Sequence, residues 1–235
     1  MKNSNGSVGK IESFSTVDGP KIRSVVFLTG CSLRCIYCHN PEFLKQQPNN
    51  TNSEELAEKL LRNKEYFKNG GGVTFSGGEP LLQSDFIIET CKVLKKHDIH
   101  IALDTAGVGN YNKEIFNYVD LIILDIKASN NLLFQKITKF NKLEESLNFL
   151  KECSNYNKPV WIRQVIVPGI NDKKENILEL KYLLKKYNNI EKIELLPYHR
   201  MGIEKYKELG IPYKLENTKY MSEDKIKELE NYLYS

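Results

Sequence analysis

Three cysteines within eight residues are the part of this sequence best suited to chemistry. Cys31, Cys35 and Cys38 are spaced C-x3-C-x2-C in a segment that directly follows the apolar run 25–28. A short loop with this spacing can bring three thiolates to three corners of one metal cluster. Iron–sulfur clusters are normally held by four cysteines. The spacing therefore favours a [4Fe–4S] cluster whose fourth iron is open to an outside group.

A structural zinc site is the alternative interpretation of the same loop. His39 follows Cys38, and three cysteines with one histidine form a closed zinc site in many proteins. Structural zinc ligands usually come as two separated pairs, whereas these lie in one loop, so the cluster is favoured. Cys91 and Cys153 are isolated within predicted helices and are interpreted as core residues. Five cysteines in this arrangement do not form a disulfide framework, which indicates a reducing cytoplasm.

Length and composition are those of a single globular domain over residues 1–235. Apolar residues make up 40% of the chain and charged residues 27%, which is ordinary for a soluble protein. The formal charge of +4 comes from dispersed lysines, so we expect no nucleic-acid partner. Apolar runs such as 121–124 are far shorter than the ~20 residues that cross a bilayer. Residues 1–6 lack the apolar segment of a signal peptide, so we expect no membrane association.

The pattern of apolar residues predicts alternating strands and helices. We expect strands at 9–14, 23–28, 73–75, 99–103, 121–124, 160–167 and 193–196. We expect helices at 53–61, at 84–96 with a cap near Ser84, at 112–118, one or two within 130–153, at 173–186, and near 203 and 222. About six β/α units in strict alternation predict a parallel sheet covered by helices.

Polar residues gather just past the carboxyl ends of these strands. They are the cysteine loop, 76–79, Asp104 with Thr105, 125–127 and His199, and Arg163 lies within a strand. In a parallel β/α barrel these ends converge on one face, where active sites are built. The motifs therefore predict one pocket.

Each motif also has a structural interpretation. Glycines at 77 and 78 let backbone amides approach a ligand closely, but they also suit a tight turn. The spacing of neither nucleotide-binding glycine fingerprint is present. Asp104 and Asp125 are equally suited to capping helices. Lys127 could be exposed to solvent, and an isolated His199 could have a structural role.

The motifs taken in order resemble the radical S-adenosylmethionine (SAM) enzymes. Within them the match is to the activating enzymes of glycyl-radical enzymes, of which the activators of pyruvate formate-lyase are the most similar. The residues that carry the resemblance are 16–20, 30–40, 71–79, 103–105, 124–127, 161–163, 167–169 and 193–199.

This resemblance implies a partial (β/α)6 barrel of the radical SAM type with N-terminal and C-terminal extensions. It implies that Cys31, Cys35 and Cys38 ligate a [4Fe–4S] cluster and that SAM chelates the fourth iron. The SAM-binding residues implied are Tyr37, His39, Gly77, Gly78, Glu79, Asp104, Asp125, Ile126, Lys127, Arg163 and His199. Asp104 and Asp125 are also implied to hold a monovalent cation.

The resemblance further implies an oxidoreductase that activates pyruvate formate-lyase. An electron from flavodoxin or ferredoxin would cleave SAM, and the 5′-deoxyadenosyl radical would take hydrogen from a backbone glycine of that partner. Alternatives are another glycyl-radical enzyme, a small molecule or modified nucleotide as substrate, or a non-catalytic zinc-stabilised binding module. A monomer is the default expectation.

Two features bear on the choice of partner. Residues 41–70 contain no cysteine, so we expect no ferredoxin-like accessory cluster. The family's D-G-P-G-I-R motif occurs with Lys21 in place of its second glycine. Because a non-glycine residue is disfavoured at positive φ, either this loop differs or the glycine is not obligatory.

Overall fold

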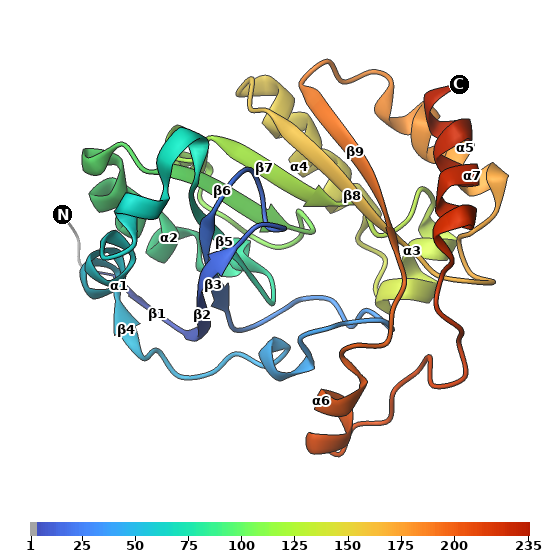
Figure 1. The fold of residues 1–235 in the computed structure, drawn as a ribbon, viewed down its shortest axis with the longest axis horizontal. Coiled ribbons are helices and arrows are strands. Elements are labelled where there is room, and N and C mark those ends of the chain that lie inside the picture. The colour runs from blue at the N-terminus through green and yellow to red at the C-terminus, as the bar shows by residue number, and fades with distance from the viewer. Residues whose placement is uncertain (1–3) are drawn as a thin grey trace.

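A curved, open sheet of seven strands forms the framework of the chain (Figure 1). The computed structural model describes residues 4–235. The strand order is β2 (Val8–Ser15), β3 (Arg23–Leu28), β5 (Gly72–Gly77), β6 (His100–Thr105), β7 (Leu121–Asp125), β8 (Val160–Ile166) and β9 (Ile190–Pro197). The six strands from β3 onward are parallel, and β2 joins β3 antiparallel as an edge. The predicted partial (β/α)6 barrel is confirmed, with its sheet ending at β2 and β9.

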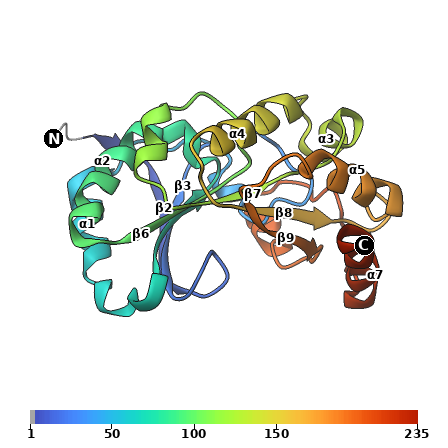
Figure 2. The same cartoon turned by 90° about the horizontal axis from the view of Figure 1, so that it is seen from above.

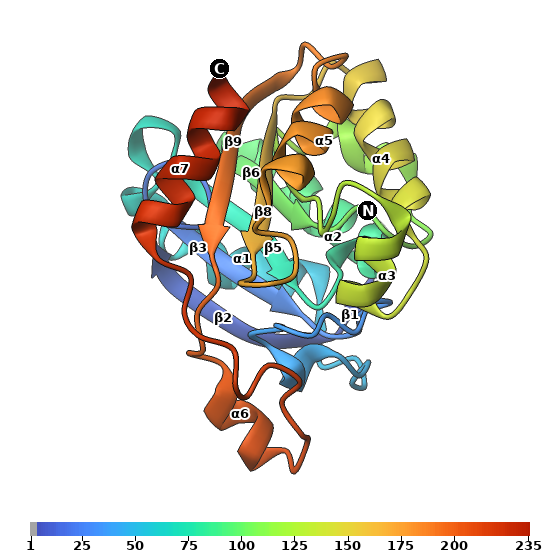
Figure 3. The ribbon, with the colours of Figure 1, turned by 90° about the vertical axis from the view of Figure 1, so that its right-hand side faces the viewer.

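Most of the helices cover the outer face of this sheet. The helices of the described residues are α1 (Ser53–Leu61), α2 (Ser84–Leu94), α3 (Asn131–Thr138), α4 (Leu143–Asn155), α5 (Lys174–Leu184), α6 (Ile203–Glu208) and α7 (Glu223–Tyr234). Figure 2 shows α1, α2, α4 and α5 along one side of the sheet. The C-terminal α7 lies against α5 and β9, whereas α6 stands apart beside residues 41–43 (Figure 3).

The alternation of side chains along the strands separates two faces. On β6 and β7, Ile101, Leu103 and Ile122 belong to the main hydrophobic core under the helices. The intervening Ala102 and Ile123 form a small separate apolar group on the opposite face. Because side chains alternate with a period of two, Asp104, Asp125 and Arg163 lie on this inner face, near the carboxyl ends of their strands.

Some local expectations are wrong in detail. Ser84 is a buried first residue of α2 rather than its cap, because a 3₁₀ turn at Pro80–Gln83 leads directly into the helix. Residues 113–117 form a 3₁₀ helix instead of an α-helix. The segment 130–153 holds two helices, and Lys139 ends the first with a left-handed φ of 69°. The pair of β1 (Asn5–Gly6) and β4 (Thr51–Asn52) was not predicted, since two-residue strands carry no periodicity.

Two expectations concern the N-terminus and membranes. Residues 1–3, part of the segment in which we expected no signal peptide, lie outside the described residues. Among residues 4–235, no helix has the length and apolar character needed to cross a membrane.

Lys21 takes the conformation that favours glycine. It is exposed and has a φ of 61°, in the loop between β2 and β3. The loop therefore keeps a left-handed turn at this position, and the lysine accepts the steric strain that a glycine would avoid. A left-handed L-residue costs about 1–2 kcal/mol relative to its ordinary conformation.

We predict that Lys21→Gly raises the free energy of unfolding by about 1 kcal/mol, because relief of this strain outweighs the added freedom of the unfolded chain. The measurement is urea denaturation of the cluster-free protein. Lys219→Gly is the matched control, since Lys219 is an exposed loop lysine outside the positive-φ set. Glycine there should be neutral or destabilising, and an equal effect of both substitutions would refute strain at Lys21.

Candidate functional site

A pocket of about 280 Å³ lies at the carboxyl ends of the parallel strands. Its lining includes all the predicted site residues except Glu79, Ile126 and Arg163: Cys31, Cys35, Tyr37, Cys38, His39, Gly77, Gly78, Asp104, Asp125, Lys127 and His199. Val165, which the sequence analysis missed, also lines it, together with Asn40, Ser76, Thr105 and Leu196, which lie in the predicted motifs but were given no role. Val165 and Leu196 are apolar strand residues, and their type gave no signal of a site.

The cysteine loop is held in place by backbone hydrogen bonds to two other segments. The Cys31 N–H donates to the Leu44 carbonyl at 3.2 Å, and the Arg34 N–H donates to the Thr138 carbonyl at 2.9 Å. The Leu33 N–H points at Cys31 Sγ at 3.4 Å. The three thiols thus project from a loop that is fixed to other segments at Cys31 and at Arg34.

Burial and a nearby lysine act in opposite directions on these thiols. Burial raises the pKa of Cys31 to about 11 and that of Cys35 to about 12, and it also raises the pKa of Cys38. The charge of Lys127 lowers the pKa of all three. Without metal the thiols are therefore protonated at neutral pH, and a bound metal takes them as thiolates.

Lys127 is the main positive charge beside the thiols. It forms an ion pair with Asp125 and lies 5.7 Å from the centre of the Tyr37 ring. Burial lowers its pKa, but the charge of the Asp125 carboxylate and its hydrogen bond to Lys127 oppose burial, and the pKa lies well above the usual value. Lys127 is thus suited to stabilise an anionic cluster.

The described residues do not form a closed zinc site. Between residues 4 and 235, no three or more histidine, cysteine or carboxylate side chains are placed to hold one metal ion. His39 instead stacks on His199, with ring centres 4.2 Å apart and planes 22° apart. Burial and the neighbouring His199 lower the pKa of His39 to about 4.

Two buried polar atoms of the pocket residues fit a site for a polar ligand. Tyr37 Oη and Asp125 Oδ1 are buried and have no hydrogen-bond partner among the described residues. Unpaired buried polar groups are rare in native proteins because each is costly. Three thiols from one loop together with these atoms fit a [4Fe–4S] cluster and a polar molecule beside it.

The glycines after β5 are required by contacts within the protein. A Cβ on Gly77, whose φ is 120°, would lie 2.3 Å from the backbone of Leu28. A Cβ on Gly78 would lie 2.1 Å from the Gly30 carbonyl oxygen, and that oxygen accepts from the Glu79 N–H at 2.7 Å. The tight-turn interpretation is therefore correct, and the same close approach places the turn beside the cysteine loop.

The Glu79 carboxylate joins the ends of two strands. It accepts from Thr105 Oγ1 at 2.5 Å and from the Ala106 N–H at 3.0 Å. Burial raises the pKa of Glu79 to about 7, although these hydrogen bonds oppose the rise. Its side chain does not line the pocket, so it positions the residues that do.

Arg163 and Ile126 also lie outside the pocket lining. Arg163 Nε donates to Glu194 at 2.9 Å, and its Nη2 donates to the Val17 carbonyl at 2.6 Å. The Ile126 side chain is fully buried in the core. Asp104, in contrast, lines the pocket and accepts from Ser76 Oγ at 2.9 Å.

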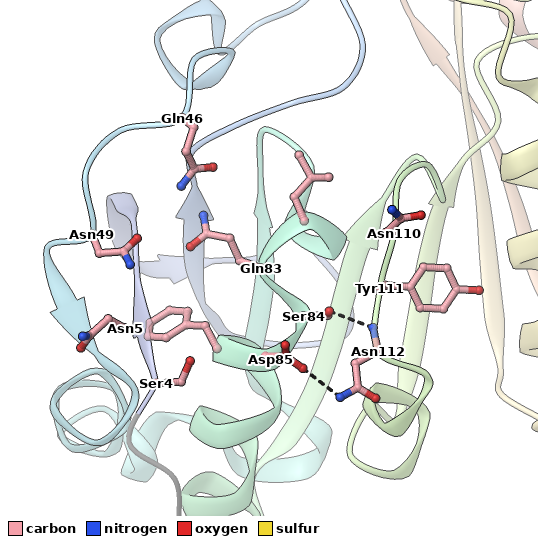
Figure 4. Close-up of a pocket in the computed structure, with 12 residues that line it drawn as sticks. Ser4, Asn5, Gln46, Asn49, Gln83, Ser84, Asp85, Asn110, Tyr111 and Asn112 are labelled. Carbon is pink, nitrogen blue, oxygen red and sulfur yellow. Dashed lines mark hydrogen bonds between the residues drawn. The ribbon is translucent and has the colours of Figure 1, made fainter.

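A larger pocket of about 540 Å³ lies elsewhere, near the start of α2 (Figure 4). Amide and hydroxyl side chains line much of it, and Figure 4 shows Asn112 bonded to Ser84 and Asp85. It has no thiol, imidazole or cationic group in its lining. This pocket is larger than the one at the strand ends, but the reactive groups gather in the smaller one.

Comparison with known proteins identifies the family. The family model of the radical SAM superfamily matches residues 25–180. A pyruvate formate-lyase-activating enzyme of Clostridium pasteurianum is 49% identical over 231 residues, which cover 97% of each chain. This chain belongs to the radical SAM activating enzymes. A second relative of the same name, from Staphylococcus epidermidis, is 42% identical and covers 97% of this chain and 95% of its own.

Solved structures agree with the activating-enzyme fold. A domain of a pyruvate-formate lyase-activating enzyme from Bacteroides vulgatus has a TM-score of 0.55 at 26% identity, covering 70% of this chain and 94% of its own. A radical SAM methyltransferase from Sphaerobacter thermophilus shares the fold, with a TM-score of 0.66 at 17% identity over 98% of this chain and 74% of its own. Activating enzymes of this kind are oxidoreductases of class EC 1.97.1.4 and use a [4Fe–4S] cluster and SAM.

We predict that Glu79→Gln removes a pH dependence of stability. The folded pKa of about 7 lies above the ordinary value of 4.5, so the stability that protonated Glu79 contributes is full below about pH 4.5 and is lost as pH rises through about 7. The free energy of unfolding of the wild type relative to Glu79→Gln should fall by roughly 3 kcal/mol across this range.

Urea denaturation of cluster-free protein at several pH values measures this difference. Glu58→Gln, at an exposed position of α1, controls for loss of one carboxylate. A difference between wild type and Glu79→Gln that stays constant from pH 5 to 8 would contradict the raised pKa.

Proposed function

We propose that this enzyme activates pyruvate formate-lyase by forming a glycyl radical on it. The observation that carries the proposal is the near full-length similarity to two relatives that bear this activity in their names. We propose that residues 1–235 act as one domain, because a single core joins residues from Val26 to Leu233. We also propose that the enzyme is cytoplasmic and monomeric.

Cys31, Cys35 and Cys38 would hold three irons and leave the fourth for SAM. When bound, the cluster and SAM supply a one-electron cleavage that yields a radical able to abstract hydrogen from a glycine Cα. The support is that all three cysteines line one pocket with Lys127, whose charge favours their thiolate forms. Flavodoxin or ferredoxin would deliver the electron.

The remaining pocket residues would bind and orient SAM. The backbone at Gly77 and Gly78 lies beside the cysteine loop and suits the methionyl amine. Tyr37 and the stacked His39–His199 pair suit the nucleoside. Asp104 and Asp125 supply carboxylates on the inner face for a monovalent cation beside SAM. Glu79 and Ile126 would act by positioning the residues that line the pocket.

Arg163 would need to change partners to reach SAM. Its guanidinium is bonded to Glu194 and to the carbonyl of Val17, in the loop between β2 and β3. Val17 is 71% exposed, so a partner protein can contact this loop directly. Movement of the loop by a bound glycine segment would free Arg163 for the pocket.

Electron paramagnetic resonance (EPR) on anaerobically purified, reduced protein tests this function. A reduced [4Fe–4S] signal that changes shape on addition of SAM, followed by a glycyl-radical signal when pyruvate formate-lyase is added, is the expected result. SAM cleavage without a glycyl radical on that partner would favour another glycyl-radical enzyme or a small-molecule substrate. Stoichiometric zinc with no iron signal would make the chain a binding module.

We predict that alanine at Cys31, Cys35 or Cys38 abolishes cluster binding and glycyl-radical formation, because each removes one of three thiolate ligands. Iron and sulfide analysis with EPR measures the outcome. Cys91→Ala and Cys153→Ala are matched controls, since both cysteines are fully buried away from the pocket. Both controls should retain the cluster, and a full cluster in Cys35→Ala would overturn the assignment.

A further inference from the structure

We propose that the outer side of the cysteine loop is the docking surface for an acidic electron-carrier protein. The surface consists of Arg34, Lys136, Lys139 and Phe140, which we call the cluster-loop face. The inference rests on the proposed function, because an electron must reach a cluster held by this loop. It adds the surface through which that electron enters.

The first observation is the distribution of charge. Residues 31–41 contain Arg34 and no acidic residue, and residues 126–143 contain four lysines and no acidic residue. Lys127 points into the pocket, and Lys142 is paired with Glu145. Arg34, Lys136 and Lys139 are exposed and have no ion pair with a carboxylate among residues 4–235.

The second observation is that the fold brings these cations together. The Arg34 N–H donates to the Thr138 carbonyl at 2.9 Å, so the tip of the cysteine loop abuts the end of α3. Lys139 follows Thr138 and ends α3 in a left-handed conformation. Its Nζ donates to the Lys136 carbonyl at 3.0 Å. Figure 1 shows the segment after β3 running across to α3.

The third observation is an aromatic residue beside these charges. Phe140 is 39% exposed, and its N–H donates to Thr138 Oγ1 at 3.2 Å, next to the Arg34 contact. Protein interfaces are enriched in aromatic residues and arginine. Complexes that transfer electrons are small and transient, and complementary charge speeds their encounter more than it strengthens them.

The position of this surface suits electron transfer. Arg34 directly precedes Cys35, and its guanidinium donates to the Cys31 carbonyl at 2.7 Å. A carrier docked here would face the cysteine side chains across the backbone of the loop. The pocket on the other side would remain free for SAM. In the transfer the carrier loses one electron and the bound cluster gains it, and no covalent bond forms or breaks.

The test compares two electron sources for the same protein. Lys136→Glu with Lys139→Glu reverses two charges and leaves Arg34, which holds loop carbonyls, unaltered. Lys59→Glu with Lys64→Glu is the matched control, since both lysines are exposed near α1, at the other end of the molecule from α3 (Figure 1). Each holoenzyme is reduced by flavodoxin hydroquinone or by dithionite, and flavodoxin affinity is measured separately on immobilised protein.

The Lys136→Glu/Lys139→Glu variant should lose at least about tenfold in the rate of reduction by flavodoxin and in flavodoxin affinity at low salt. The rate at which flavodoxin reduces this variant should depend less on ionic strength than the wild-type rate does. Its reduction by dithionite and its iron content should match the control. Unchanged flavodoxin kinetics and affinity would overturn the docking surface, whereas failure of dithionite to support SAM cleavage in the wild type would overturn the proposed function instead.

Discussion

The structure depends on the close approach of two backbone segments at the ends of β3 and β5. Gly78 lies against the Gly30 carbonyl so closely that a side chain has no room, and hydrogen bonds from Gly78 and Glu79 join the two segments. The parallel register of Leu28 with Gly77 makes both strands end at the same level. The cysteine loop and the glycine turn are therefore fixed relative to one another before any ligand binds, and Glu79 extends this connection to β6.

Burial of charge is the cost of this arrangement. The thiols and Glu79 are all desolvated, which disfavours their charged forms. Lys127 partly offsets this for the thiols, while its ion pair with Asp125 keeps the lysine charged. Sites with several groups moved from their ordinary pKa are typical of catalytic centres. The fold itself therefore moves the pKa values of these groups.

Most of the fold was predictable because its signals are local. Strands such as β3 and helices such as α1 match the predicted bounds, since their apolar patterns are local, and the Asn52 side chain caps α1 at the predicted start. The grouping of Asp104, Asp125 and Lys127 followed from parallel topology alone. Long-range contacts were not predictable. Nothing local indicates that Arg163 bonds to Glu194 and Val17. For the left-handed φ of Lys21, the only signal was the glycine that the family motif has at this position.

The small pocket in an open barrel has a consequence for any protein substrate. A pocket of about 280 Å³, which is also the proposed site of SAM, cannot admit a folded domain. The proposed protein substrate would therefore have to expose its glycine by local opening before it could react. Apparent affinity then falls by the fraction of partner molecules that are open. Selectivity among proteins would thus depend on the conformational equilibrium of the substrate as much as on contacts with the enzyme.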